Sequence, residues 1–229
     1  MKYTLIMIML GLAGTCFAGQ SVVASAPAPV APAWGVELGG TYNFALGKYS
    51  RGALGDLKKN HVNTIGGDIT GLYNIDENQA VTLRFGYGYG SDKFGVWTPS
   101  PDVSAHMRER LHSFTIMPGY RYTYALNDKW SLYAGANVGL AANIAKDSYT
   151  FVDDRRSRTT MDAHKSAWGF AWSIESGAKY QINETVSVFA AVSYSGNTAR
   201  PSVRYAGENW GKMRTQQYLG VRAGVGFSF

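Results

Sequence analysis

The residues whose types and spacing could do chemistry fall into two groups in this chain. The first is His164 and Ser166, two positions apart, with Asp162 before them and Glu175 after them. A serine oxygen, an imidazole base and an orienting carboxylate within hydrogen-bond reach can transfer or hydrolyse acyl groups. A pair with this spacing also arises by chance, so we expect no catalytic residues and no enzyme.

The second group consists of charges that stand between apolar neighbours. Arg84 lies between a leucine and a phenylalanine, and Arg222 lies between a valine and an alanine. Such alternation has period two, which is typical of a β-strand with one apolar and one polar face. Charges on the polar face can then form ion pairs with one another, provided that the strands bring that face together.

The clearest strand of this kind ends the chain. Between residues 213 and 229 every second residue is compatible with lipid, and the residues between are polar or small. Such a strand crosses a membrane only inside a closed barrel, because an open edge would leave backbone groups without partners in hydrocarbon. This segment therefore predicts an all-β membrane protein.

A short motif occurs three times and joins alternating segments, at residues 73–77, 124–128 and 180–184. Its Asn and Asp side chains bond locally to backbone, which favours tight turns. Alternation predicts eight strands, near 36–46, 63–73, 81–89, 114–122, 130–140, 168–180, 186–194 and 213–229. Four longer connections are expected at 47–62, 91–110, 142–165 and 196–212.

The N-terminal segment predicts export from the cytoplasm. Residues 1–18 read as a signal peptide, with Lys2, an apolar run and a small-residue cleavage context before Gly19. Residues 19–33 form an Ala/Pro-rich periplasmic linker, which leaves 34–229 for the barrel. Cys16 is the only cysteine; a lipoprotein signal is the alternative for it, but residues 13–15 do not fit one. We expect no disulfide, metal site or cofactor.

Residues 34–229 resemble the small eight-stranded outer-membrane barrels of the OmpA transmembrane-domain, OmpX and opacity-protein type. The resemblance implies an eight-stranded antiparallel up-and-down transmembrane β-barrel, in the outer membrane of a Gram-negative-type bacterium, with short turns and both termini in the periplasm. The ending with Val225, Phe227 and Phe229 looks like the signal read by the barrel assembly machinery. That machinery, outer-membrane lipids and lipopolysaccharide are the expected partners.

Strand phase places seven charged residues inside the barrel, since an arginine facing mid-membrane lipid would cost about 2–4 kcal/mol. They are Glu37, Asp68, Arg84, Arg121, Glu175, Lys179 and Arg222. An eight-stranded barrel is just wide enough to be filled by side chains, so a paired electrostatic plug is favoured. Inward glycines such as Gly86 and Gly220 leave room for water and favour the alternative, a narrow pore.

The long connections, together with Arg214 just after the last of them, carry sixteen Lys and Arg against nine Asp and Glu, in a chain of net charge +6. Lipopolysaccharide phosphate is the nearest anionic partner at that end, whereas nucleic acid does not fit the location. The expected contacts are Lys58, Lys59, Arg108, Arg110, Arg155, Arg156, Arg158 and Arg204. Binding of host surface glycans or proteins is the alternative for these charges.

The sequence as a whole predicts a non-enzymatic outer-membrane barrel with a largely filled lumen. Its basic extracellular loops would serve a structural or surface-interaction role, of the adhesin or opacity type. A narrow outer-membrane pore is the alternative. A lipid A acyl hydrolase is a further alternative, because deacylases of this fold use a His-x-Ser pair that His164 and Ser166 would match.

Overall fold

A computed structural model describes residues 34–46, 62–100, 103–153, 158–200, 202–205, 208–212 and 216–229. The predicted signal peptide (1–18) and linker (19–33), with Cys16, lie outside these residues. Both segments therefore stay predictions.

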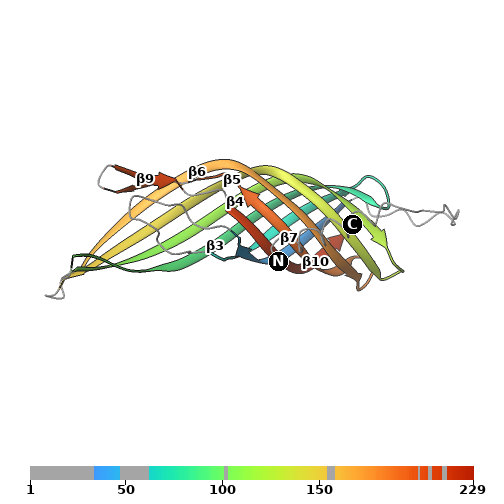
Figure 1. Ribbon diagram of the computed structural model, residues 1–229. Helices are drawn as coiled ribbons and strands as arrows, with labels where there is room; N and C mark the ends of the chain where they lie inside the picture. Colours follow the sequence, from blue (N-terminus) through green and yellow to red (C-terminus); the bar gives the residue numbers. More distant parts are fainter. Residues whose placement is uncertain are drawn as a thin grey trace, which may run out of the picture. The chain divides into compact units, whose positions relative to one another are not determined.

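The described chain is built from antiparallel strands that close into a barrel (Figure 1). Eight strands form the wall in the order β1-β10-β7-β6-β5-β4-β3-β2, and β8 and β9 pair separately as a two-stranded sheet. This confirms the predicted fold. The strands are β1 (Trp34–Ala45), β2 (Thr64–Asn74), β3 (Gln79–Ser100), β4 (Val103–Ala125), β5 (Trp130–Asp153), β6 (Arg158–Gln181), β7 (Val186–Asn197), β8 (Ser202–Tyr205), β9 (Glu208–Lys212) and β10 (Gln216–Ser228).

The three repeated motifs form three tight turns of the same design. Asp76 Oδ1 accepts hydrogen bonds from the backbone N–H groups of Asn78 and Gln79, at 2.8 and 2.7 Å. Asn127 and Asn183 accept the corresponding pairs of bonds after β4 and β6. The side chain thus satisfies backbone donors that the turn takes out of the ladder. We call this end of the barrel the turn end and the opposite end the hairpin end.

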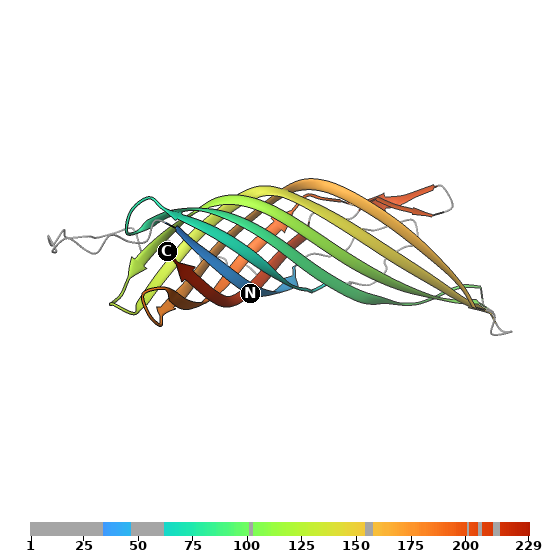
Figure 2. The ribbon, with the colours of Figure 1, turned by 180° about the vertical axis from the view of Figure 1, so that it is seen from behind.

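The strands at the hairpin end are longer than the sequence predicts. The expected loops at 91–110 and 142–165 are wrong in the described residues, because β3 and β4, and likewise β5 and β6, continue as paired strands through most of them (Figure 2). Outside hydrocarbon a strand needs no apolar face, so its lipid-facing alternation stops while backbone pairing continues. The expected loop at 196–212 contains β8 and β9, and the last barrel strand begins at Gln216.

The barrel is strongly staggered. Followed from strand to strand, the hydrogen-bonded neighbours of Gly35 lead around the wall and back to β1 at Ala45, ten residues further on. A stagger of this size tilts the strands by roughly 35–45° and leaves an interior that side chains can fill. Inward residues that meet at one height therefore come from very different distances along their strands.

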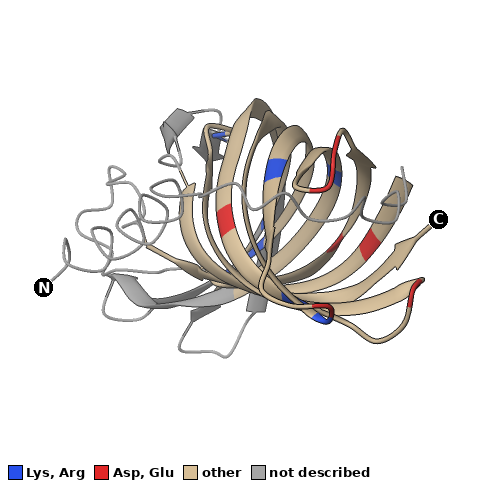
Figure 3. Cartoon of the chain, turned by 90° about the vertical axis from the view of Figure 1, so that its right-hand side faces the viewer, with Lys and Arg blue, Asp and Glu red and all other residues tan. Residues whose placement is uncertain are grey.

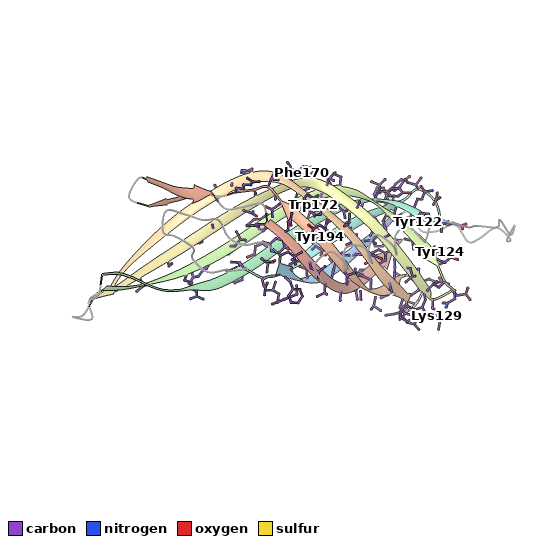
Figure 4. All side chains as sticks on the ribbon, viewed as in Figure 1. Tyr122, Tyr124, Lys129, Phe170, Trp172 and Tyr194 are labelled. Atoms are coloured by element: carbon purple, nitrogen blue, oxygen red, sulfur yellow. The ribbon has the colours of Figure 1, made fainter. Side chains whose placement is uncertain are left out.

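Two groups of aromatic side chains lie on the outer face, one toward each end (Figure 4). At the turn end, Trp34 packs on Tyr73 and Trp130 on Tyr180, with ring centroids 4.8 and 4.9 Å apart. Further toward the hairpin end, beside the end of β7, Trp172 packs on Tyr194 at 4.9 Å. Exposed aliphatic side chains such as Ile69, Leu132 and Val221 lie on the same outer surface. An apolar band between two aromatic girdles is the surface of a transmembrane barrel.

Candidate functional site

The inward face of the wall carries charged side chains from six different strands, and Figure 3 shows acidic and basic positions on several sides of the barrel. All six side chains are buried, with exposed fractions of 1–8%. They are Glu37 on β1, Asp68 on β2, Arg84 on β3, Arg121 on β4, Glu175 on β6 and Arg222 on β10. Burial of a charged group costs free energy unless the group is paired. The distances between these side chains therefore decide whether they stabilise the barrel.

Half of these charges are joined through Arg121. Its guanidinium donates two hydrogen bonds to Glu37, from Nη1 to Oε1 at 2.5 Å and from Nη2 to Oε2 at 3.0 Å. Nη2 also donates to Glu175 Oε1 at 3.2 Å. The two-pronged contact is the strong form of an arginine–carboxylate pair.

The other contacts close the set into a ring. Arg84 Nη2 donates to Glu175 Oε1 at 2.6 Å, and its Nε lies 3.9 Å from Asp68 Oδ1. Arg222 donates from Nη2 to Asp68 Oδ1 at 2.5 Å and from Nη1 to Glu37 Oε2 at 3.2 Å. Three arginines and three carboxylates therefore alternate around the lumen, and each has a partner on both sides. We call these six residues the charged ring.

Uncharged neighbours hold the ring in place. Thr70 Oγ1 accepts hydrogen bonds from Arg84 and Arg222 and donates one to Asp68, each at 3.2 Å. The guanidinium of Arg121 lies 4.3 Å from the centre of the Tyr133 ring, and that of Arg222 lies 4.4 Å from the Phe189 ring. Stacking on an aromatic face stabilises a desolvated guanidinium.

Lys179 is the one predicted interior charge outside the charged ring. It is half-buried on β6, and none of the described carboxylates lies within ion-pair distance of it. The other six predicted interior charges are the ones that the structure brings together.

Gly39 is a residue of the site that sequence reasoning missed. A Cβ atom at this position would lie 2.8 Å from Arg222 Nε and 3.0 Å from Asp68 Oδ2. The absent side chain therefore leaves the space in which the Arg222–Asp68 pair sits. A glycine at an inward position next to predicted charges was the available signal.

A cavity of about 120 Å³ lies between the charged ring and the hairpin end. Asp68, Arg84 and Arg222 are among its lining residues, and hydroxyl side chains such as Thr115 and Ser193 form much of the rest. A polar space of this size accommodates several water molecules at about 10–15 Å³ each.

Two layers stand above this cavity, and neither was predicted. In the first, the Asn143 amide donates to Asn197 Oδ1 at 2.9 Å and to the backbone oxygen of Ala199 at 2.9 Å. In the second, Val62, Leu111 and Ala145 pack together with exposed fractions of 0–4%. The lumen thus changes from charged to amide to apolar toward the hairpin end.

The predicted basic contacts are only partly covered by the structure. Arg108 and Arg110 are exposed on β4, on the hairpin-end side of His112 and Phe114. Arg158 begins β6 and Arg204 belongs to β8, where only the backbone is described. Lys58, Lys59, Arg155 and Arg156 lie outside the described residues.

The predicted assembly signal lies at the seam that closes the barrel. Phe227 pairs in register with Val36, and Val225 pairs with Leu38. Phe229 donates from its backbone N–H to the oxygen of Trp34 at 3.0 Å. The seam geometry is a structural fact, and the recognition of these residues by an assembly machinery stays a prediction.

The strand geometry removes Glu175 from the acyl-transfer alternative. Ser166 is exposed on β6, whereas Glu175 is buried on the inner face of that strand. An odd separation along a strand places two side chains on opposite faces, so this carboxylate cannot orient a base beside Ser166. The side chains of Asp162 and His164 lie outside the described set.

Within the described residues no cluster of His, Cys, Asp and Glu could hold a metal ion. That part of the chain also contains no helix long and apolar enough to cross a membrane.

The antiparallel barrel with two aromatic girdles defines the class of small membrane barrels. The chain belongs to the outer membrane protein beta-barrel domain family, which matches residues 17–229. This membership places the protein in the outer membrane of a Gram-negative bacterium. A search of curated proteins gave no match.

Several solved structures are similar to this chain at low identity. OprG from Pseudomonas aeruginosa is 15% identical, with 87% of this chain and 97% of that chain covered and a TM-score of 0.48. Neisserial surface protein A is 14% identical, with coverage of 88% and 100% and a TM-score of 0.44. The attachment invasion locus protein Ail of Yersinia pestis is 13% identical, with coverage of 85% and 98% and a TM-score of 0.37.

Proposed function

We propose that this protein is a non-conducting outer-membrane barrel that carries a paired β-sheet out of the membrane for surface contacts, with no enzymatic role. The observation that carries the proposal is the charged ring, because six mutually paired side chains meet across the lumen. An ion that passed would have to break pairs in a desolvated interior, where an unpaired charge costs several kcal/mol. The amide and apolar layers add a second obstruction.

The sheet at the hairpin end supports the surface role. β2 pairs with β3 only as far as Gly90, and in the described ladder β3 continues to Ser100 against β4 alone. β6 pairs with β7 only from Ala171 onward, so in the described ladders residues 158–168 pair with β5 alone. A sheet with unpaired edges can accept a strand from a partner. In this proposal the hairpin end faces outward, and the acidic turn end and both termini face the periplasm.

Single-channel recording in a planar bilayer tests the filled lumen. The wild-type protein, with its folded state verified by gel shift, should give no conductance steps. An Arg84→Ala, Arg222→Ala variant that still folds is the matched comparison and should also give no steps, because the amide and apolar layers still close the lumen. Conductance in the wild type would contradict the proposal.

A narrow pore is the second candidate, and one observation favours it. Arg121 Nε, Tyr133 OH and Glu175 Oε2 are buried without a hydrogen-bond partner among the described residues. Buried polar atoms of this kind call for water in the lumen. Wild-type steps that the Arg84→Ala change alters would establish this function instead.

A further inference from the structure

Two cations stand directly opposite each other on the outer wall at the hairpin end. Arg110 of β4 pairs in register with Lys146 of β5, and Arg108 occupies the next outward position on β4. Both arginines are exposed and Lys146 is half-buried. Like charges at directly opposed positions destabilise a sheet, so this arrangement favours a bound counter-ion.

The described side chains do not supply that counter-ion. None of the ion pairs among them includes Arg108, Arg110 or Lys146. Arg108 Nε donates to Ser91 Oγ at 3.4 Å, which is a contact with an uncharged group. Among the described side chains, the cation cluster therefore has no anionic partner.

The height of the cluster indicates which anion this is. On the same outer face, the next row toward the turn end holds Tyr89 and His112, whose rings lie 5.2 Å apart. The row after that holds Tyr87 and Phe114, with rings 5.0 Å apart. Aromatic rings of this kind mark the boundary between hydrocarbon and head groups. The cluster lies just beyond that boundary, at the level of lipid phosphates.

We propose that Arg108, Arg110 and Lys146 form a binding site for the phosphate groups of lipid A in lipopolysaccharide. The inference rests on the proposed function, which turns the hairpin end toward the outer leaflet. Directly opposed residues have Cβ atoms about 4.5–5.5 Å apart, so one phosphate can contact both Arg110 and Lys146. Arginine offers two parallel N–H donors to phosphate oxygens, and Arg108 extends the site along the strand.

The test measures the unfolding midpoint of the refolded protein in a phosphate-free neutral detergent. Bisphosphorylated lipid A should raise the midpoint of the wild type. The Arg110→Ala, Lys146→Ala variant should need at least ten times more lipid for the same rise. Lys129→Ala is the matched control, because Lys129 is exposed in a tight turn at the other end (Figure 4), and it should respond like the wild type.

Two further arms identify the ligand. Without lipid, the double variant should unfold at the wild-type midpoint or above it, because the repulsion between neighbouring cations is gone. Lipid A stripped of its phosphates should give no rise, and neither should inorganic phosphate alone. A full response from the double variant, or an equal response to inorganic phosphate, would overturn the lipid site. Neither outcome bears on the filled lumen, which the conductance measurement tests separately.

Discussion

Each carboxylate of the charged ring contacts two arginines, so a change at one member of the ring takes a partner away from two others. Glu175 Oε1 accepts from both Arg84 and Arg121, and Glu37 binds both Arg121 and Arg222. Loss of one arginine leaves its partners with unbalanced negative charge inside the barrel. The stability of the barrel interior therefore depends on every charge of the ring being paired rather than on any single ion pair.

We expect Arg84→Ala to lower the free energy of unfolding by about 3–5 kcal/mol, because Glu175 and Asp68 each lose a partner in a buried site. The measurement is the urea midpoint of the refolded protein, read from the heat-modifiable gel band. Lys129→Ala serves as the surface control. A midpoint within error of the wild type would show that the ring does not stabilise the fold.

Gly39→Ala should destabilise the barrel by about 1–3 kcal/mol, since the new methyl group would push into the Arg222–Asp68 pair. Gly40→Ala is the matched control. A Cβ there would meet only the backbone oxygen of Ala223, at 3.9 Å. Comparison of the two urea midpoints separates the effect on the ring from the general effect of replacing glycine in a strand.

The inward direction of Arg84 and Arg222 could be predicted from their apolar neighbours, but the pairing could not. Arg222 bonds to Asp68, which is 154 residues away in sequence, and the stagger of the barrel decides that they meet. The same holds for Asn143 and Asn197, which come from β5 and β7. Alternation along a strand predicts whether a side chain points into the lumen or toward lipid. It does not predict the level along the barrel axis at which that side chain lies.

Among the elements, the three tight turns show how a short motif fixes a connection. In the third turn, Asn183 Oδ1 accepts from the backbone N–H groups of Thr185 and Val186 at 3.0 and 2.8 Å. The repeated motif made these turns predictable, because the side chain that closes each turn is written in the local sequence. The extensions of β3 to β6 were not predictable in this way, since their pairing outlasts the lipid-facing pattern.

Asn183→Ala should cost about 1 kcal/mol, because two backbone donors lose their acceptor in a turn that water partly reaches. Glu184→Ala in the same turn should change the urea midpoint little, since that exposed side chain makes no hydrogen bond among the described residues. An equal loss in the two variants would mean that the Asn183 side chain does not hold the turn.

For the whole molecule, closure depends on a seam between the first and the last strand. Trp34 and Phe229 exchange backbone hydrogen bonds of 3.0 and 3.3 Å at the turn end of this seam. The seam joins residues that are synthesised first and last in the barrel, so it forms only when the full set of strands is present.

Deletion of Phe229 should reduce insertion into the outer membrane of cells several-fold while refolding in detergent continues, because most of the β1–β10 ladder remains. The measurement compares the folded gel band in the outer-membrane fraction with that of purified, refolded protein. Phe229→Tyr keeps the aromatic end and should insert normally. Normal insertion of the deletion variant would remove Phe229 from the assembly signal.

The alternating charges of the ring also limit which substitutions this sequence can accept during evolution. Each of the six residues forms ion pairs with two others on different strands. Arg222, for example, pairs with both Glu37 and Asp68. A mutation that is tolerated at one of them must be accompanied by a compensating change at a distant one, so the six should vary together among descendants of this gene. The lipid-facing residues contact only apolar surroundings. Each of them can therefore be replaced by another apolar residue without a change elsewhere.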